Sequence, residues 1–142
     1  MRASFDIEKK LEMILRLLEN LASESAKGVP IIVEGRKDIE ALNKLEIKGT
    51  IIAAKTEGKN LLDVLNEVEE HGKNEVILLM DFDRRGREMM KYLMQCLEEM
   101  KTKPNTIFWK EFSSLLKGDI KDIEGLSTFI KTLKRKVGRN IE

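Results

Sequence analysis

Two kinds of apolar spacing follow one another along the chain. Aliphatic residues spaced by four and three between positions 7 and 21 predict an amphipathic helix, which ends in the polar segment before Gly28. This helix packs either on the protein's own sheet or against a partner. Farther along, apolar and β-branched residues occur in short unbroken runs. These runs predict four strands, at residues 31–33, 51–54, 76–80 and 106–109.

The segments between and after these runs have helical spacing instead. They predict helices at residues 39–45, 61–68, 89–100, 111–116 and 124–137. Unbroken apolar strands are typical of parallel sheets with both faces covered, and the gaps between them are long enough for parallel crossovers. We therefore predict an α/β fold: an open, mainly parallel sheet of about four strands with helices on both faces. Residues 1–28 would form a helix packed on the domain of residues 29–142, which ends in a basic helix.

Composition narrows the class of protein. Hydrophobic residues make up 42% of the chain and charged residues 36%, which is typical of a globular protein. No apolar run approaches the roughly 20 residues that cross a bilayer, and no signal-type apolar block opens the sequence. We therefore expect a cytoplasmic protein without a membrane partner. The single cysteine, Cys96, excludes an intramolecular disulfide and a cysteine-rich zinc site.

Positive charge is local rather than global. The 26 Lys and Arg residues nearly balance 25 Asp and Glu residues, so net charge alone does not indicate a nucleic-acid-binding protein. One basic cluster consists of Arg84, Arg85 and Arg87, and a second extends from Lys131 to Arg139 and includes Lys134 and Arg135. The second cluster is either a solvated helix face or a contact surface for a nucleic-acid backbone.

Carboxylates follow two of the predicted strands. Glu34 comes directly after the first strand, and Asp81 and Asp83 come after the third. Ligands of open parallel sheets bind beyond the carboxyl ends of the strands. If the chain stays extended after the third strand, both Asp side chains point to one side, and Glu34 joins them if the two strands are neighbours. Alternatively, Asp83 caps a helix and Glu34 is a structural ion-pair partner.

The donor atoms of this predicted site are all oxygens. Such a set favours Mg²⁺, or Mn²⁺, over zinc, and Mg²⁺ usually takes one or two carboxylates together with substrate phosphate. Asp122 either caps the last helix or approaches the metal from the side. Trp109 either packs in the core or stacks on a base. The groups that we expect to bind phosphate or nucleic acid are Gly35, Lys37, Lys55, Lys59, Arg84, Arg87, Lys134 and Arg135.

Two segments resemble a known family. Residues 33–42 (VEGRKDIEAL) and residues 79–86 (LMDFDRRG) are similar to the two motifs of the Toprim domain. This domain occurs in topoisomerases, bacterial-type primases, recombination proteins and some nucleases. The spacing is most similar to that of small stand-alone members, such as the ribonucleases that mature the smallest ribosomal RNA and primase-like proteins of archaea and bacteria.

The resemblance implies roles for individual residues. Glu34 matches the family's acid-base residue, Asp81 and Asp83 match its metal-binding pair, and Gly35 matches the glycine beside the acid. The sequence departs from the family at Phe82, where many relatives have proline, and at Arg87, where many have glutamate. These departures put a second metal position in doubt.

We therefore expect a Mg²⁺-dependent Toprim protein acting on nucleic-acid phosphodiesters, as a nuclease or nucleotidyl transferase, with RNA processing favoured. Glu34 and Arg85 would be the catalytic residues. The alternative is a non-catalytic or weakly catalytic module that binds RNA or DNA within a larger assembly. Further partners would be other proteins or a second copy of the chain, bound through the N-terminal helix.

Overall fold

The computed structural model of the protein describes the backbone of residues 2–141 and the side chains of residues 6–138. Its elements are, in chain order, α1 (Arg2–Ala26), β1 (Ile31–Val33), α2 (Arg36–Lys44), β2 (Ile51–Ala53), α3 (Leu61–His71), β3 (Glu75–Leu79), α4 (Arg84–Glu99), β4 (Lys103–Asn105), α5 (Ile107–Leu116) and α6 (Leu126–Ile141). The side chain of Arg139, which ends the second basic cluster, lies outside the described residues.

The four strands form one parallel sheet in the order β2-β1-β3-β4. The predicted open α/β fold is therefore confirmed. In the register of the sheet, Val33 at the end of β1 lies opposite Ala53 of β2 and Leu79 of β3. Because β1 and β3 are neighbours, the residues that follow these two strands emerge at the same edge.

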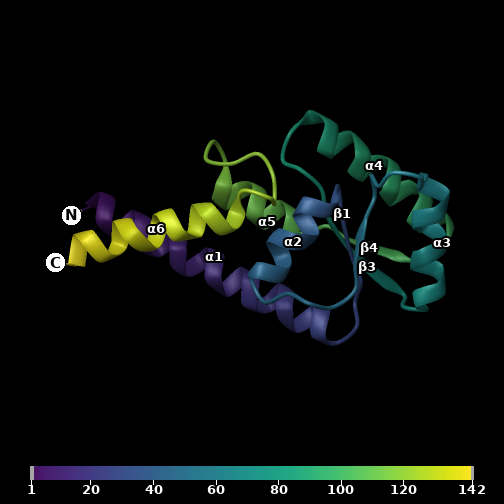
Figure 1. Cartoon of the computed structure of the whole chain (residues 1–142), viewed down its shortest axis with the longest axis horizontal. Helices are drawn as coiled ribbons and strands as arrows, with labels where there is room; N and C mark the ends of the chain where they lie inside the picture. The colour runs from purple at the N-terminus through teal and green to yellow at the C-terminus, as the bar shows by residue number, and fades with distance from the viewer. Residues whose placement is uncertain (1, 142) are drawn as a thin grey trace.

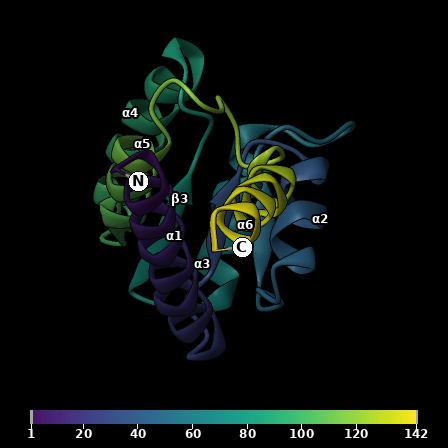
Figure 2. The same cartoon turned by 90° about the vertical axis from the view of Figure 1, so that its left-hand side faces the viewer.

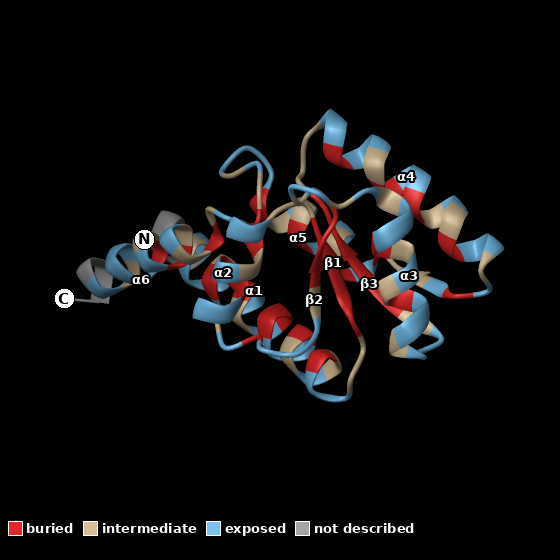
Figure 3. Cartoon of the chain, turned by 45° about the vertical axis from the view of Figure 1, so that its right-hand side comes forward, coloured by how far each residue is buried: buried red, intermediate tan, exposed pale blue. Residues whose placement is uncertain are grey.

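Helices cover both faces of the sheet, and the strands are buried between them (Figures 1 and 3). Alternate residues of β1 serve different cores, since successive side chains of a strand point to opposite faces. Ile31 and Val33 pack with residues of α1, α2, α5 and α6. Ile32 packs with residues of α3 and α4. This two-sided burial explains why the strands are unbroken apolar runs.

Helix α1 lies against α5 and α6 (Figure 2). Its aliphatic stripe is buried there through Ile14, Leu17 and Leu21. Both α1 and α6 extend well beyond the sheet, and the two chain ends lie together at their far end (Figure 1). Within the described residues, no helix is long and apolar enough to cross a membrane.

The predicted fourth strand is misplaced. Residues 106–109 begin α5, and the strand is the preceding segment, Lys103–Asn105. Pro104 is compatible with this strand because β4 lies at the edge of the sheet. The Asn105 side chain accepts a hydrogen bond from the Ile107 backbone N–H at 3.0 Å and so favours the start of α5. Phe108 and Phe112, four residues apart, are buried on one face of that helix.

Candidate metal centre and phosphate site

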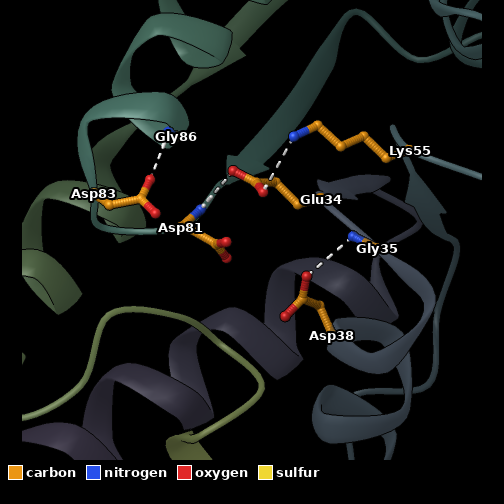
Figure 4. A network of polar contacts seen from close by, with 7 residues as sticks. All are labelled: Glu34, Gly35, Asp38, Lys55, Asp81, Asp83 and Gly86. Atoms are coloured by element: carbon orange, nitrogen blue, oxygen red, sulfur yellow. Dashed lines mark hydrogen bonds and ion pairs between the residues drawn. The ribbon is translucent and has the colours of Figure 1, made fainter.

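Glu34 and Asp81 meet at the carboxyl edge of the sheet (Figure 4). Glu34 follows β1 directly, and Asp81 lies two residues beyond the end of β3. The backbone N–H of Asp81 donates to Oε1 of Glu34 at 3.3 Å. The strand order thus fulfils the condition under which Glu34 was expected to join the aspartates.

Lys55 holds the other side of the Glu34 carboxylate. Its Nζ lies 3.8 Å from Oε2 of Glu34, and its backbone N–H donates to the Glu34 carbonyl at 2.7 Å. Only 13% of the Glu34 side chain is exposed, whereas 55% of the Lys55 side chain is. The glutamate is therefore fixed between two strand ends, with a solvent-accessible cation beside it.

A hollow of about 270 Å³ opens in front of these residues. We call it the carboxylate hollow, because five acids line it: Glu34, Asp38, Asp81, Asp122 and Glu124. Its cations are Arg36, Lys37 and Lys55, so two of the predicted phosphate-binding lysines and the predicted glycine Gly35 border it. Mixed acids and bases of this kind suit a phosphate ester that arrives together with a divalent cation.

Crowding of the acids changes their protonation. The pKa of Asp81 rises from 3.8 to about 8, first because the carboxyl is partly buried and then because of its hydrogen bond to Glu34 and the charges of Glu34, Asp38 and Asp122. Burial also raises the pKa of Asp38, although backbone hydrogen bonds from Gly35 and Glu124 oppose the rise. A cation in the hollow would remove this repulsion and favour the ionised carboxylates.

Asp83 has a different local role. It caps α4, and its Oδ1 accepts a hydrogen bond from the Gly86 backbone N–H at 2.8 Å. Residues 81–83 lead into the helix, and Asp83 is not among the residues that line the carboxylate hollow. Across residues 6–138, no three His, Cys, Asp or Glu side chains are already placed to enclose a metal ion. The assignment of Asp83 as a metal ligand stays a prediction.

Gly86 is required by close contact with Asp81. A Cβ atom at this position would lie 2.0 Å from the Asp81 carbonyl oxygen and 2.7 Å from its carbonyl carbon. Both partners are backbone atoms, which cannot move aside as a side chain could. Gly86 therefore allows the first turn of α4 to pack directly on the strand end that positions Asp81. At Gly35, by contrast, an added Cβ would meet no atom within 4 Å.

The remaining predicted basic residues do not line the carboxylate hollow. Lys59 forms an ion pair with Glu67 of α3, and Arg84 pairs with Glu88 at 3.2 Å. Arg85 is exposed in the first turn of α4, and the Arg87 guanidinium donates to the Phe82 carbonyl at 3.4 Å. Lys134 and Arg135 are exposed on α6, which extends away from the sheet (Figure 1). These groups form a scattered basic surface rather than one cluster.

Asp38 was absent from the predicted site. It is only 6% exposed, and its Oδ2 accepts from the Gly35 backbone N–H at 3.0 Å. An acid three residues after a helix N-cap is a capping signal, so the sequence pattern alone did not indicate that Asp38 lines the hollow. Asp122 accepts a hydrogen bond from the Gly125 backbone N–H at 2.8 Å, just before α6, and it also lines the hollow. Its approach to a metal stays a prediction.

Comparison with known proteins identifies the family. The model of the Toprim domain matches residues 29–115, a segment that contains Glu34, Asp81 and Asp83. The chain belongs to the Toprim family. A UPF0292 protein of Methanocaldococcus jannaschii is 38% identical over 124 residues, which are 87% of this chain and 94% of that protein. A UPF0292 protein of Methanosarcina barkeri is 33% identical over 92% of this chain and 89% of its own.

A solved structure is similar as well. The structure of a protein from Aquifex aeolicus matches this Toprim chain with a TM-score of 0.66 and 28% identity, covering 77% of this chain and 94% of that one. Membership of the Toprim family indicates a metal-binding role in nucleic-acid metabolism. The donors fit such a metal, because the carboxylate hollow offers only oxygen ligands and a cation would relieve the burial and repulsion that raise the pKa of Asp81. Asp122 and Glu124 lie beyond the matched segment and are features of this chain's own hollow.

Proposed function

We propose that this Toprim protein is a Mg²⁺-dependent cytoplasmic enzyme that cleaves or forms phosphodiester bonds in nucleic acid, with RNA processing favoured. The observation that carries the proposal is the contact between Glu34 and Asp81 at the edge of the sheet, where Asp81 is crowded by acids and has a pKa of about 8. Crowded oxygen ligands next to lysines suit a Mg²⁺ ion bound together with a phosphate.

Asp81, together with Glu34 and Asp83, would hold the metal. Mg²⁺, or Mn²⁺, would supply Lewis-acid stabilisation of a phosphoryl oxygen at this position. Each of the three carboxylates would contribute oxygen donors, which are the ligands that both ions accept.

Glu34 is the residue that we assign to proton transfer. Its carboxylate is fixed by the Asp81 N–H and by Lys55, so that it faces the hollow in one orientation. It would take the proton from the attacking oxygen or return it to the leaving oxygen. A fixed orientation favours this role, because proton transfer needs hydrogen-bond distance to the reacting oxygen.

Cations around the hollow would hold the phosphate. Lys37 and Lys55 line it directly, and the N–H of Gly35 lies at its border, where Asp38 already accepts its hydrogen bond. Arg85, which is exposed in the first turn of α4, would stabilise charge that develops on the phosphoryl group. Arg84, Arg87, Lys59, Lys134 and Arg135 would contact more distant parts of the backbone of the nucleic acid.

The second candidate is a binding module that turns over slowly or not at all. It is favoured by the position of Asp83, whose carboxylate is engaged as the cap of α4 instead of lining the hollow. Such a module would present the exposed cations of α6 to RNA or DNA. The helix pair α1 and α6 would then dock on a protein assembly or on a second copy.

A panel of labelled RNA and DNA substrates, single-stranded, duplex and structured, tests the proposal. Each is incubated with the protein and Mg²⁺, Mn²⁺ or a chelator. We expect cleavage or extension that needs the metal. Glu34→Gln should lower the rate by at least about 100-fold, the range for loss of a general acid-base residue. The matched control is Glu40→Gln, an exposed acid on α2.

Two outcomes would contradict the enzymatic proposal. If Glu34→Gln reacts as fast as the Glu40→Gln control, Glu34 is not the proton-transfer residue. If the protein retains the nucleic acids but changes none of them with any metal, the binding module is the better description.

A further inference from the structure

A second, larger hollow lies next to the carboxylate hollow. Its volume is about 710 Å³, within the range of sites that enclose a small molecule. We call it the basic hollow, because its lining includes four cations, Arg87, Lys110, Lys117 and Lys121. Two aromatic rings, Phe82 and Trp109, also line it.

A backbone hydrogen bond joins two segments that each contribute residues to both hollows. The Phe82 N–H donates to the Lys121 carbonyl oxygen at 2.7 Å, which joins the end of β3 to the loop before α6. In the two segments that this bond joins, Asp81 and Asp122 line the carboxylate hollow, whereas their neighbours Phe82 and Lys121 line the basic hollow. A nucleic-acid strand with one phosphate at Asp81 would therefore have its next nucleotide beside Phe82.

The basic hollow has an excess of positive charge. Its only acid is Asp119, whose carboxylate already pairs with Lys10 of α1 at 2.8 Å. Among the side chains of residues 6–138, none forms an ion pair with Lys110, Lys117 or Lys121. These three lysines can therefore bind an anionic ligand without first losing an internal partner.

The two rings give the hollow an aromatic wall. Their centroids are 6.0 Å apart with an interplanar angle of 36°, and both side chains are only partly buried. Trp109 is held by its Nε1–H, which donates to the Met80 carbonyl at 3.0 Å. Aromatic rings beside a basic groove are the combination by which proteins bind single strands, because every base has a face that can stack.

We propose that the basic hollow binds one unpaired nucleotide of a single-stranded nucleic acid, adjacent to the phosphate at the carboxylate hollow. Its base would stack against Phe82 and Trp109, and its phosphate would be held by Lys110, Lys117 and Lys121. This inference rests on the proposed function, since it places the nucleotide relative to the reacting phosphate. Such a nucleotide site would make the protein selective for single strands, because the bases of a duplex are already stacked on one another.

Fluorescence of the tryptophan tests this directly, because Trp109 is the only tryptophan of the chain. The probes are single-stranded oligonucleotides of RNA and of DNA, and duplexes of the same sequences, titrated into the full chain in the presence of a chelator. We expect the single strands to quench the emission and the duplexes to leave it nearly unchanged. Absence of quenching, or equal quenching by duplexes, would overturn the proposal.

Two variants separate stacking from charge. Phe82→Leu removes the ring but keeps the backbone contact with Lys121, and we expect single-strand affinity to fall about fivefold or more. The double variant Lys110→Gln and Lys117→Gln changes only exposed side chains, so it should fold normally. It should lower the slope of log K against log salt by about 0.7, the loss of one neutralised phosphate on a single strand.

The matched control is the double variant Lys91→Gln and Lys103→Gln, two exposed lysines outside both hollows. We expect wild-type affinity and salt dependence from it. If the Lys110 and Lys117 variant binds like this control, the basic hollow does not hold the nucleotide.

Failure of this inference is distinguishable from failure of the proposed function. Quenching without any metal-dependent reaction supports the nucleotide site and contradicts the enzymatic activity. Metal-dependent reaction without quenching, at a wild-type kcat/KM in the Lys110 and Lys117 variant, supports the activity and contradicts the nucleotide site.

Discussion

The carboxylate hollow and the basic hollow are adjacent but carry opposite charge. On one side, five acids line the hollow, and the pKa of one of them, Asp81, is raised by burial and by its acidic neighbours. On the other, four cations and two rings face a single acid that is already paired. Without a bound metal ion, the acids of the carboxylate hollow would repel a phosphate. The lysines of the basic hollow can attract a phosphate with no metal present. Binding and chemistry should therefore be separable: binding of a single strand should survive removal of the metal by a chelator, whereas the reaction should not.

The largest effect should come from a substitution of Gly86, because its close contact with Asp81 positions the strand end that borders both hollows. Gly86→Ala would push a Cβ to within 2.0 Å of the Asp81 carbonyl oxygen and displace the backbone that carries Asp81 and Phe82. We expect a loss of about 1–3 kcal/mol in the free energy of unfolding, as for other overpacked sites. Denaturant unfolding measures it.

The control for this change is Gly138→Ala on α6, where an added Cβ meets no atom within 4 Å. It should leave stability unchanged or raise it slightly, because alanine favours a helix. Equal stability of both variants would show that the contact between α4 and the end of β3 does not constrain the two hollows.

A pH effect should be confined to the carboxylate hollow. The Asp81 carboxyl has a pKa of 3.8 in the unfolded chain and about 8 in the folded one, so between these values the folded state binds more protons. Stability in chelator should therefore fall as pH rises from about 4 to about 8, and Mg²⁺ should oppose the fall. Thermal melting at several pH values measures it, with Asp81→Asn as the comparison. A melting temperature with the same pH dependence in Asp81→Asn would contradict the assignment.

The smallest predicted effect separates the two roles of Asp83. Asp83→Ala should cost about 1 kcal/mol of stability, because α4 loses its cap at Gly86. Asp83→Ser can still cap and should restore most of this loss. If Asp83 also binds Mg²⁺, the serine variant should recover stability without recovering metal-dependent activity, which parallel melting and activity assays would detect. Full activity in the serine variant would limit Asp83 to capping.

The sequence predicted the sheet well because its strands are buried on both faces and follow one another with helical crossovers. Glu34 and Asp81 could be found because residues after neighbouring parallel strands share one edge. The error at residues 106–109 arose because a short apolar run fits a strand or a buried helix equally well. The hydrogen bond from the Ile107 N–H to the Asn105 side chain and the burial of Phe108 and Phe112 on one face favour the helix.

Other parts of the site depend on contacts between distant segments. Asp38 resembles a capping acid in sequence, but in the fold it is buried near Asp122 and Glu34, which come from distant segments. The basic hollow joins Phe82 of the β3 end, Lys110 of α5 and Lys121 of that same loop. These residues are far apart along the chain, so no local pattern could have indicated that they line one hollow.

The most direct test of the central claim is calorimetric titration of Mg²⁺ into the protein near pH 7, in two buffers with different enthalpies of ionisation. Because the pKa of the Asp81 carboxyl is raised to about 8 when no cation is bound, we expect metal binding with release of protons, seen as a heat that depends on the buffer. Asp81→Asn should weaken binding and abolish the proton release. Binding of equal affinity and equal buffer dependence in wild type and Asp81→Asn, or no binding to the wild type, would contradict the account.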